Sequence, residues 1–147
     1  MTSPASQGLS LYEAARVAGV TFSTEVVPED HFVEANGMRF HYLDWGNADK
    51  PDMLLLHGFA QQCHSWDFVA LAFSDKFHVR ALDLRGHGDS DWAPDGDYSP
   101  ETQQNDIKGV VQEIGLKDFV LMGLSMGGRN SFTYASNNPD EIRALVI

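Results

Sequence analysis

The chain has 147 residues, of which 43% are hydrophobic and 21% charged, a composition typical of one folded domain with its own core. Its formal net charge of −11 argues against nucleic acids and anionic membranes as partners. The single cysteine, Cys63, excludes an intramolecular disulfide and gives no framework for a metal site. Met1–Gly8 lacks the features of a signal peptide and no apolar run is long enough to span a bilayer, so we expect a soluble, cytoplasmic protein.

The N-terminal residues, 1–30, stand apart from the main pattern as an extension. Met1–Leu9 is predicted to be disordered. Ser10 and Glu13 have the spacing of a capping box, which together with Gly19 predicts a short helix over Leu11–Ala18. We expect this helix to cover a sheet edge; packing on a partner is the alternative.

Residues 31–147 are predicted to form the core domain, which opens with a β-hairpin. Two short strands, His31–Ala35 and Met38–Asp44, flank Asn36-Gly37. This dipeptide favours a two-residue turn because both positions need positive φ. The apolar run Met53–Leu56 is typical of a strand buried on both faces.

Helices and strands alternate through the rest of the chain. The predicted elements are a helix capped by Ser65, a strand over Phe77–Leu82, a helix from Ser99-Pro100 to Gly115, a strand over Asp118–Met122, a helix over Met126–Asn137 and a strand starting at Arg143. This alternation predicts an α/β fold, a mostly parallel sheet with helices on both faces and an antiparallel hairpin at its start. In such sheets the functional site lies beyond the carboxyl ends of the strands.

A Gly-x-Ser-x-Gly pattern at residues 123–127 joins a predicted strand to a predicted helix. Side chains at Gly123 and Gly127 would collide with neighbouring backbone in so tight a turn, and the turn would hold the Ser125 hydroxyl clear of the surface. Ser125 is therefore a candidate nucleophile. The alternative is a serine in an ordinary glycine-rich turn, because the pattern is common by chance.

A nucleophilic serine also needs hydrogen-bond donors for the oxyanion that its attack creates. The backbone N–H groups of Met126, directly after the nucleophile, and of Phe59, after His57-Gly58, are the candidates. Glycine at position 58 would let the backbone approach the substrate. The side chain of Met126 is also expected to touch substrate.

The general base is harder to assign. The chain has six histidines: His31, His41, His57, His64, His78 and His87. Only His57 and His87 lie on loops near the predicted site, and both are flanked by glycine, which favours a role in turn geometry. His87-Gly88-Asp89 offers two metal ligands but no third at a recognised spacing, so neither a metal nor a cofactor is expected.

Asp83 and Arg85 follow the next predicted strand end. An acid that orients the base is one interpretation of Asp83; an ion pair or loop-fixing hydrogen bonds is the one we favour. Phe59, Trp66 and Trp92 would line an apolar acyl pocket or belong to the core, and the core is favoured for Trp66.

Four motifs taken together resemble the α/β-hydrolase superfamily, from about His31 to Ile147. They are His57-Gly58-Phe59, Asp83–Ser90, Gly123–Gly128, and Pro139-Asp140 leading to Ala144–Ile147. The chain looks most like the branch of serine esterases, C–C-bond hydrolases and haloperoxidase-like enzymes. A serine at position 125 argues against the epoxide hydrolase and haloalkane dehalogenase branches, which resemble it elsewhere but use aspartate there.

The resemblance implies a hydrolase of ester or related acyl bonds, possibly C–C bonds, in a small molecule, with Ser125 as nucleophile. It covers only an N-terminal half, truncated at about the sixth strand, because the family's acid, histidine and lid come from later segments. Little activity is therefore expected of this chain alone. The alternatives are a non-catalytic small-molecule binding protein on the same fold, or a half-fold that self-associates through the strand edge near Arg143–Ile147.

Overall fold

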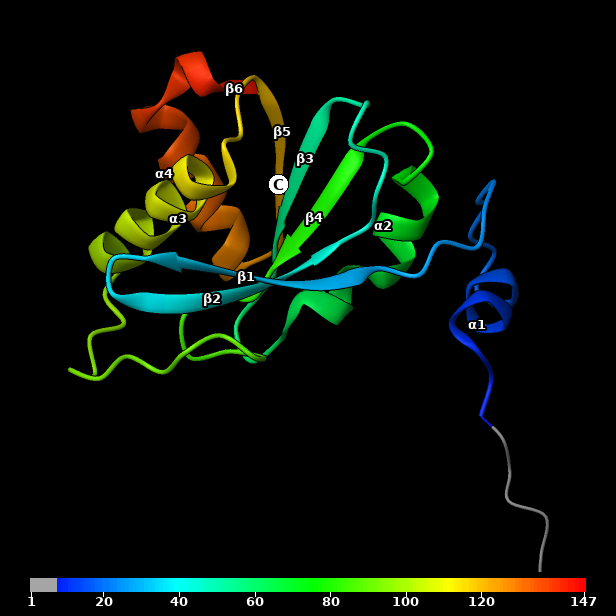
Figure 1. Ribbon diagram of the computed structural model, residues 1–147, viewed down its shortest axis with the longest axis horizontal. Coiled ribbons are helices and arrows are strands. Elements are labelled where there is room, and N and C mark those ends of the chain that lie inside the picture. Colours follow the sequence, from blue (N-terminus) through cyan, green and yellow to red (C-terminus); the bar gives the residue numbers. More distant parts are fainter. Residues whose placement is uncertain (1–7) are drawn as a thin grey trace, which may run out of the picture.

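The computed structural model describes residues 8–147; residues 1–7, and with them most of the segment predicted to be disordered, lie outside the described part. The described chain forms a six-stranded sheet in the order β1-β2-β4-β3-β5-β6 (Figure 1). Its strands are β1 (Glu29–Ala35), β2 (Met38–Asp44), β3 (Asp52–Leu56), β4 (His78–Leu82), β5 (Phe119–Gly123) and β6 (Ile142–Val146). β1, β2 and β4 pair antiparallel, whereas β3, β4, β5 and β6 run parallel to one another, which confirms the predicted fold class.

Helices cover both faces of this sheet. They are α1 (Leu11–Val17), α2 (Asp67–Phe73), α3 (Pro100–Ile114) and α4 (Met126–Asn137), with 3₁₀ turns η1 (Cys63–Trp66) and η2 (Pro139–Glu141). α3 and α4 pack on one face, and α1 and α2 on the other (Figure 1). Among residues 8–147, no helix combines the length and the apolar character needed to cross a membrane.

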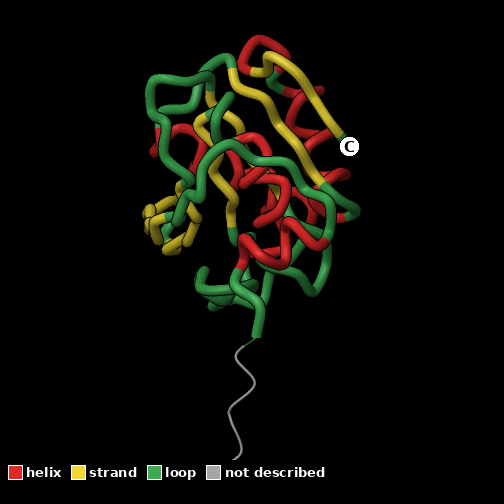
Figure 2. Tube along the Cα trace, turned by 90° about the vertical axis from the view of Figure 1, so that its right-hand side faces the viewer, coloured by secondary structure: helices red, strands yellow, loops and turns green. Residues whose placement is uncertain are grey.

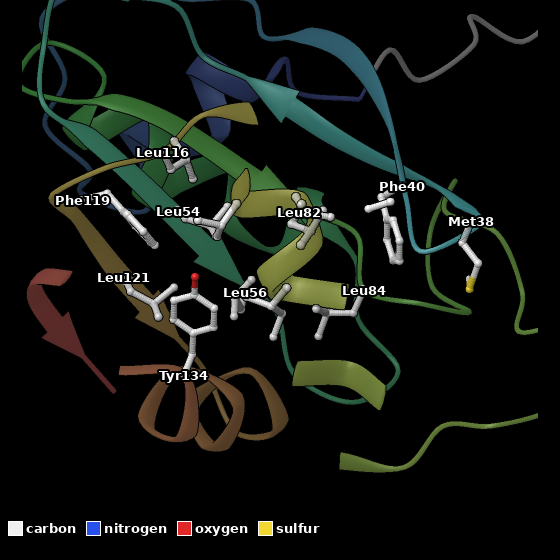
Figure 3. Packing of buried hydrophobic residues seen from close by; sticks show 14 residues of the cluster. Met38, Phe40, Leu54, Leu56, Leu82, Leu84, Leu116, Phe119, Leu121 and Tyr134 are labelled. Atoms are coloured by element: carbon white, nitrogen blue, oxygen red, sulfur yellow. The ribbon is translucent and has the colours of Figure 1, made fainter. Parts of the chain in front are cut away.

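The central strand β3 is buried on both faces, as its apolar run predicts. Leu54 and Leu56 face α3 and α4, and Met53 and Leu55 face α2, because successive side chains of a strand alternate between faces. Figure 3 shows Leu54 and Leu56 among side chains from neighbouring strands, close to Tyr134 of α4. The sheet is thereby fixed between two apolar layers, which makes it a rigid base for the loops at its carboxyl edge.

Local sequence signals explain where several elements begin and end. Ser10 and Glu13 form the predicted capping box at the start of α1. Ser99 caps α3, and Gly115 ends it in the left-handed conformation at φ 79°. α1 joins the apolar layer on the α2 face through Ala15, which is fully buried.

The prediction that Ser65 caps the next helix is wrong. Ser65 lies inside η1, and α2 begins only at Asp67, without a side-chain cap. The Cys63 N–H donates to the carboxylate of Asp83 at 2.6 Å. This long-range hydrogen bond accompanies a 3₁₀ turn that begins two residues before Ser65.

The two edges of the sheet differ in character. β1 forms one edge and carries the charged residues Glu29, Asp30 and Glu34. β6 forms the other edge and ends beside the C-terminus, with Val146 and Ile147 exposed (Figure 2).

Candidate functional site

Three loops meet at the carboxyl edge of the parallel strands. They follow β3, β4 and β5, so the segments after Leu56, Leu82 and Gly123 lie next to one another in the sheet order β4-β3-β5. The Leu124 N–H donates to the carbonyl of Leu56 at 3.1 Å and extends the pairing of β5 with β3 into the turn. The predicted site residues on these loops are therefore brought together.

Ser125 has an unusual backbone conformation. It lies between β5 and α4 with φ 54° and ψ −113°, a combination that L-residues rarely adopt. Such a conformation costs about 1–3 kcal/mol and persists only where the surrounding structure enforces it. The residue is exposed, so the strained turn presents its hydroxyl to the open carboxyl edge of the sheet.

The flanking glycines enforce this turn because no side chain fits at either position. A Cβ on Gly127 would lie 2.0 Å from the carbonyl oxygen of Leu56, and one on Gly123 would lie 2.3 Å from the carbonyl oxygen of Gly127. Backbone atoms of β3 and α4 thus approach the turn more closely than any Cβ allows. The sequence reasoning about Gly123 and Gly127 agrees with this geometry.

The loop after β3 lies directly beside the serine. A Cβ built on Gly58 would come within 3.4 Å of the Cβ of Ser125. The Gly58 N–H donates to Gln61 Oε1 at 2.9 Å, whereas the Phe59 N–H takes part in none of the hydrogen bonds of the described loops. Met126 is the first residue of α4, so its N–H has no acceptor within the helix. Two backbone donors thus remain available near Ser125.

His57 is committed to holding two loops together. Its Nδ1–H donates to the Gly58 carbonyl at 2.8 Å, and its Nε2 accepts from the Leu84 N–H at 3.0 Å. The ring is fully buried, and burial lowers the pKa of His57. Both ring nitrogens of His57 are therefore engaged, and the neutral ring links the loops after β3 and β4. His57 is not free to accept the proton of Ser125.

Asp83 is the centre of a buried hydrogen-bond network. It accepts from His41 Nδ1 at 2.8 Å and from the Cys63 and Asp89 N–H groups at 2.6 and 3.0 Å. Burial opposes ionisation, but these donors outweigh it and hold the pKa of Asp83 below its usual range. A Cβ on Gly88 would lie 2.0 Å from the carboxylate, so the loop closes tightly around it.

Arg85 does not pair with Asp83. Its guanidinium makes a bidentate contact with Asp106 of α3, at 2.8 Å for the Nη2–Oδ1 pair, and also donates to the Asp97 carbonyl. The Asp106 carboxylate raises the pKa of Arg85. Arg85 therefore ties the loop after β4 to α3, and its charge is neutralised.

His87 lies on the loop after β4, and one of its ring nitrogens makes no hydrogen bond to the described residues. Its Nδ1 donates to the Arg85 carbonyl at 2.9 Å. Its ring lies 4.9 Å from that of His57 and 6.3 Å from that of Phe59. None of the hydrogen bonds among residues 8–147 joins Ser125 Oγ to this or another of the six histidines.

A cavity of about 660 Å³ is bordered by Met126, the residue directly after Ser125, and by Phe59 of the loop after β3. Its lining combines aromatic side chains with two arginines and no carboxylate: Phe59, Arg85, Gly86, His87, Trp92, Tyr98, Gln103, Met126 and Arg129. Phe59 and Trp92 are 77% and 78% exposed, whereas Trp66 is buried in the apolar layer under α2. Trp66 thus belongs to the core, as favoured, whereas Phe59 and Trp92, for which the sequence left both interpretations open, line the cavity.

Sequence reasoning missed three residues of this cavity, Tyr98, Gln103 and Arg129. Arg129 had a usable signal, because it stands four residues after Ser125 on a predicted helix and so shares its face. Tyr98 had none: it comes from a turn-rich loop and reaches the cavity only by packing over Gly86.

His41, Cys63 and Asp83 are the described residues whose arrangement could suit a metal ion. Their ligand atoms lie within 4.8 Å of one another, and all three residues are buried. Asp83 is already occupied by the hydrogen bonds above, and burial raises the pKa of the Cys63 thiol, whereas metals bind the thiolate. His41 also contacts Asp30 at 2.9 Å through Nε2. We interpret the cluster as a structural link between the β1–β2 hairpin and the loop after β4.

Comparison with known proteins places this chain in a family. Residues 51–147 match the family described as alpha/beta hydrolase fold. The chain belongs to this family. Epoxide hydrolase 4 from Mus musculus is 37% identical over 116 residues, which are 78% of this chain and 32% of the relative.

Two further proteins are similar to this chain over a larger share of its length. An esterase of Mycobacterium tuberculosis is 34% identical over 137 residues, 93% of this chain and 43% of the esterase. The crystal structure of a putative lipase from Acinetobacter baumannii superposes with a TM-score of 0.79 at 24% identity, over 97% of this chain and 47% of the lipase, and shares the fold. This α/β-hydrolase chain thus spans less than half the length of these relatives.

Proposed function

We propose that this chain carries the nucleophile and oxyanion hole of a serine hydrolase that cleaves ester or related acyl bonds, C–C bonds included, of a small molecule. Ser125 Oγ attacks the carbonyl carbon, and the N–H groups of Phe59 and Met126 stabilise the oxyanion. The histidine and the acid of the triad come from outside the described residues. Binding of an acyl substrate requires no metal or cofactor in this scheme.

The observation that carries the proposal is the backbone of Ser125. A turn that places a non-glycine residue at φ 54° and ψ −113°, with no room for a Cβ at Gly123 or Gly127, costs stability. An ordinary loop would relieve this strain with glycine at position 125. Strain that is retained at one exposed hydroxyl, beside two unused N–H donors, supports a catalytic use of that hydroxyl.

The chemistry of a serine favours acyl substrates over epoxides, although one of the relatives is an epoxide hydrolase. Attack of Ser125 Oγ on an ester expels an alcohol and leaves an acyl-enzyme ester, which water can hydrolyse. Attack on an epoxide would leave an ether, which water does not cleave at a useful rate. Turnover through Ser125 therefore requires an acyl group.

The direct test compares the complete gene product with its Ser125→Ala variant on 4-nitrophenyl esters of short acids. We expect kcat to fall by at least about 10³-fold in the variant, because the nucleophile is lost while the fold is kept. Ser65→Ala, which removes an exposed hydroxyl of η1 away from the cavity, serves as the matched control and should leave kcat unchanged. Equal rates for wild type and Ser125→Ala would contradict the proposal.

The second candidate is a non-catalytic binding protein on the same fold. It is favoured by one observation: no described histidine is hydrogen-bonded to Ser125 Oγ. Such a protein would retain small-molecule binding in the 660 Å³ cavity without reacting at the serine. Binding of an ester that stays intact after long incubation with the complete gene product would support this candidate.

A further inference from the structure

Arg129 stands out among the arginines of this acidic chain. Five of the six arginines form ion pairs with carboxylates: Arg16 with Glu25, Arg39 with Asp91, Arg80 with Asp44 and Asp52, Arg85 with Asp106, and Arg143 with Asp118. Arg129 has no carboxylate within 4.0 Å among the described residues. In a chain with 21 acidic and 10 basic residues, this exposed arginine has kept its charge available for an anionic ligand.

Arg129 lies close to the candidate nucleophile. Its N–H donates to the Ser125 carbonyl at 2.9 Å, so it lies one helical turn after the nucleophile. Helical side chains tilt toward the N-terminus and cover the preceding turn. We therefore expect the exposed side chain of Arg129 to extend toward Ser125. Arg129 lines the cavity next to Met126, and it also borders a second hollow between α3 and α4.

The cavity also lacks negative charge. None of its nine lining residues is aspartate or glutamate, although the chain has a net charge of −11. Of its two arginines, Arg85 is neutralised by Asp106, which leaves the charge of Arg129 available. The remaining walls are mainly aromatic, including Phe59 and Trp92.

We propose that this cavity selects acyl substrates that carry a carboxylate, which Arg129 binds while the aromatic side chains hold the apolar body. A planar guanidinium matches a carboxylate with two parallel hydrogen bonds, and a single unpaired arginine matches a single negative charge. The inference rests on the proposed function, because it assumes that the cavity beside Ser125 receives the substrate.

The test uses two esters that differ at one group, which is a carboxylate in one and its methyl ester in the other. Mono(4-nitrophenyl) terephthalate carries a rigid carboxylate that cannot reach its own ester group, and its methyl ester is the neutral match. The complete gene product should have a kcat/KM about tenfold higher for the carboxylate ester, the effect of one charge-assisted contact. Arg129→Gln should abolish this preference through KM and leave the neutral ester within about twofold, while Arg129→Lys retains part of it.

Lys108→Gln is the matched control, because it removes one positive charge from α3 outside the cavity. It should leave the preference for the carboxylate ester unchanged. Raising the salt concentration should narrow this preference in wild type and in Lys108→Gln alike, and should have no effect in Arg129→Gln. Equal use of both esters by wild type, or an equal loss on both in Arg129→Gln, would overturn the carboxylate inference while the serine mechanism stands.

A binding measurement separates this inference from the proposed function. Terephthalate should bind the Ser125→Ala variant in calorimetry. The heat of binding should disappear in the double variant that carries both Ser125→Ala and Arg129→Gln. If wild type turns over neither ester but this pattern is found, the carboxylate site stands and the serine mechanism fails. No difference in terephthalate binding between the two proteins would overturn the site.

Discussion

The strained backbone of Ser125 links stability to function at a single residue. Glycine adopts φ 54° without steric cost, whereas serine and alanine do not. We therefore expect Ser125→Gly to be more stable than Ser125→Ala by about 1 kcal/mol, even though glycine usually destabilises. Urea unfolding of both variants measures the difference. Equal stability, or a more stable alanine variant, would show that the turn is not strained in solution.

Asp83 makes the free energy of unfolding depend on pH. The sign of this dependence follows from the direction in which the pKa of Asp83 is shifted. Its folded-state pKa lies below the ordinary value because the donors around it outweigh burial. Its contribution is therefore fully present above an unfolded-state pKa of about 3.9 and is lost as pH falls through the lower folded-state value. Asp83→Asn should destabilise the chain at pH 7.

The gap between wild type and Asp83→Asn should then shrink as pH falls below about 4. Chemical unfolding at a series of pH values between 7 and 3 tests this expectation. Asp89→Asn is the control, because the Asp89 side chain makes none of the hydrogen bonds in the network and only its N–H contacts Asp83. A gap that stays constant down to pH 3 would contradict the depressed pKa.

At the scale of elements, the contact between α4 and β3 depends on Gly127. A Cβ there would lie 2.0 Å from the Leu56 carbonyl, and the obstacle is backbone that cannot move aside. Gly127→Ala should therefore push α4 off the sheet and cost about 2–4 kcal/mol, measured by urea unfolding.

Gly96→Ala separates this steric effect from backbone strain. Gly96 has φ 71°, but no atom lies within 4 Å of a Cβ built there. Its substitution should cost about 1 kcal/mol, which is the strain alone. A similar loss for both variants would mean that α4 relaxes and that the close approach is not essential.

Elements fixed by local signals could be predicted from the sequence. Asn36 and Gly37 adopt the positive φ angles, 51° and 75°, that their hairpin turn requires, and Ser99 caps α3 as its position before proline predicts. Elements that depend on distant contacts could not. η1 accompanies a hydrogen bond between Cys63 and Asp83, twenty residues apart, and the commitment of His57 depends on the Leu84 N–H in another loop.

The candidate site was predictable to the extent that it is made of backbone and glycine. The placement of Ser125 and Gly58 follows from strand ends that meet at one sheet edge. Side-chain partners were not predictable, since Arg85 pairs with Asp106 of α3 and Asp83 with His41 of β2. Sequence pattern gives no spacing for such pairs.

At the scale of the whole molecule, the two edges of the sheet are expected to differ in how readily they pair with a strand of another chain. β1 carries charged residues, which discourage pairing with another strand. At the other edge, Val146 of β6 and the following Ile147 are 44% and 71% exposed. We expect the 147-residue polypeptide to self-associate through β6 as its concentration rises, which sedimentation velocity can follow.

Val146→Lys should shift this polypeptide toward the monomer, because a charge on an edge strand opposes pairing. Val27→Lys, which places the same charge on an exposed valine outside the sheet, is the matched control. A polypeptide that stays monomeric at high concentration would show that the β6 edge does not drive association.

The central claim is that Ser125 is the nucleophile, and covalent labelling tests it most directly. The complete gene product is treated with a fluorophosphonate, digested and examined by mass spectrometry. We predict one phosphonate adduct, on Ser125, that is absent from Ser125→Ala and retained in Ser65→Ala. An unlabelled Ser125, or an adduct on another residue in an enzyme that still hydrolyses esters, would contradict the account.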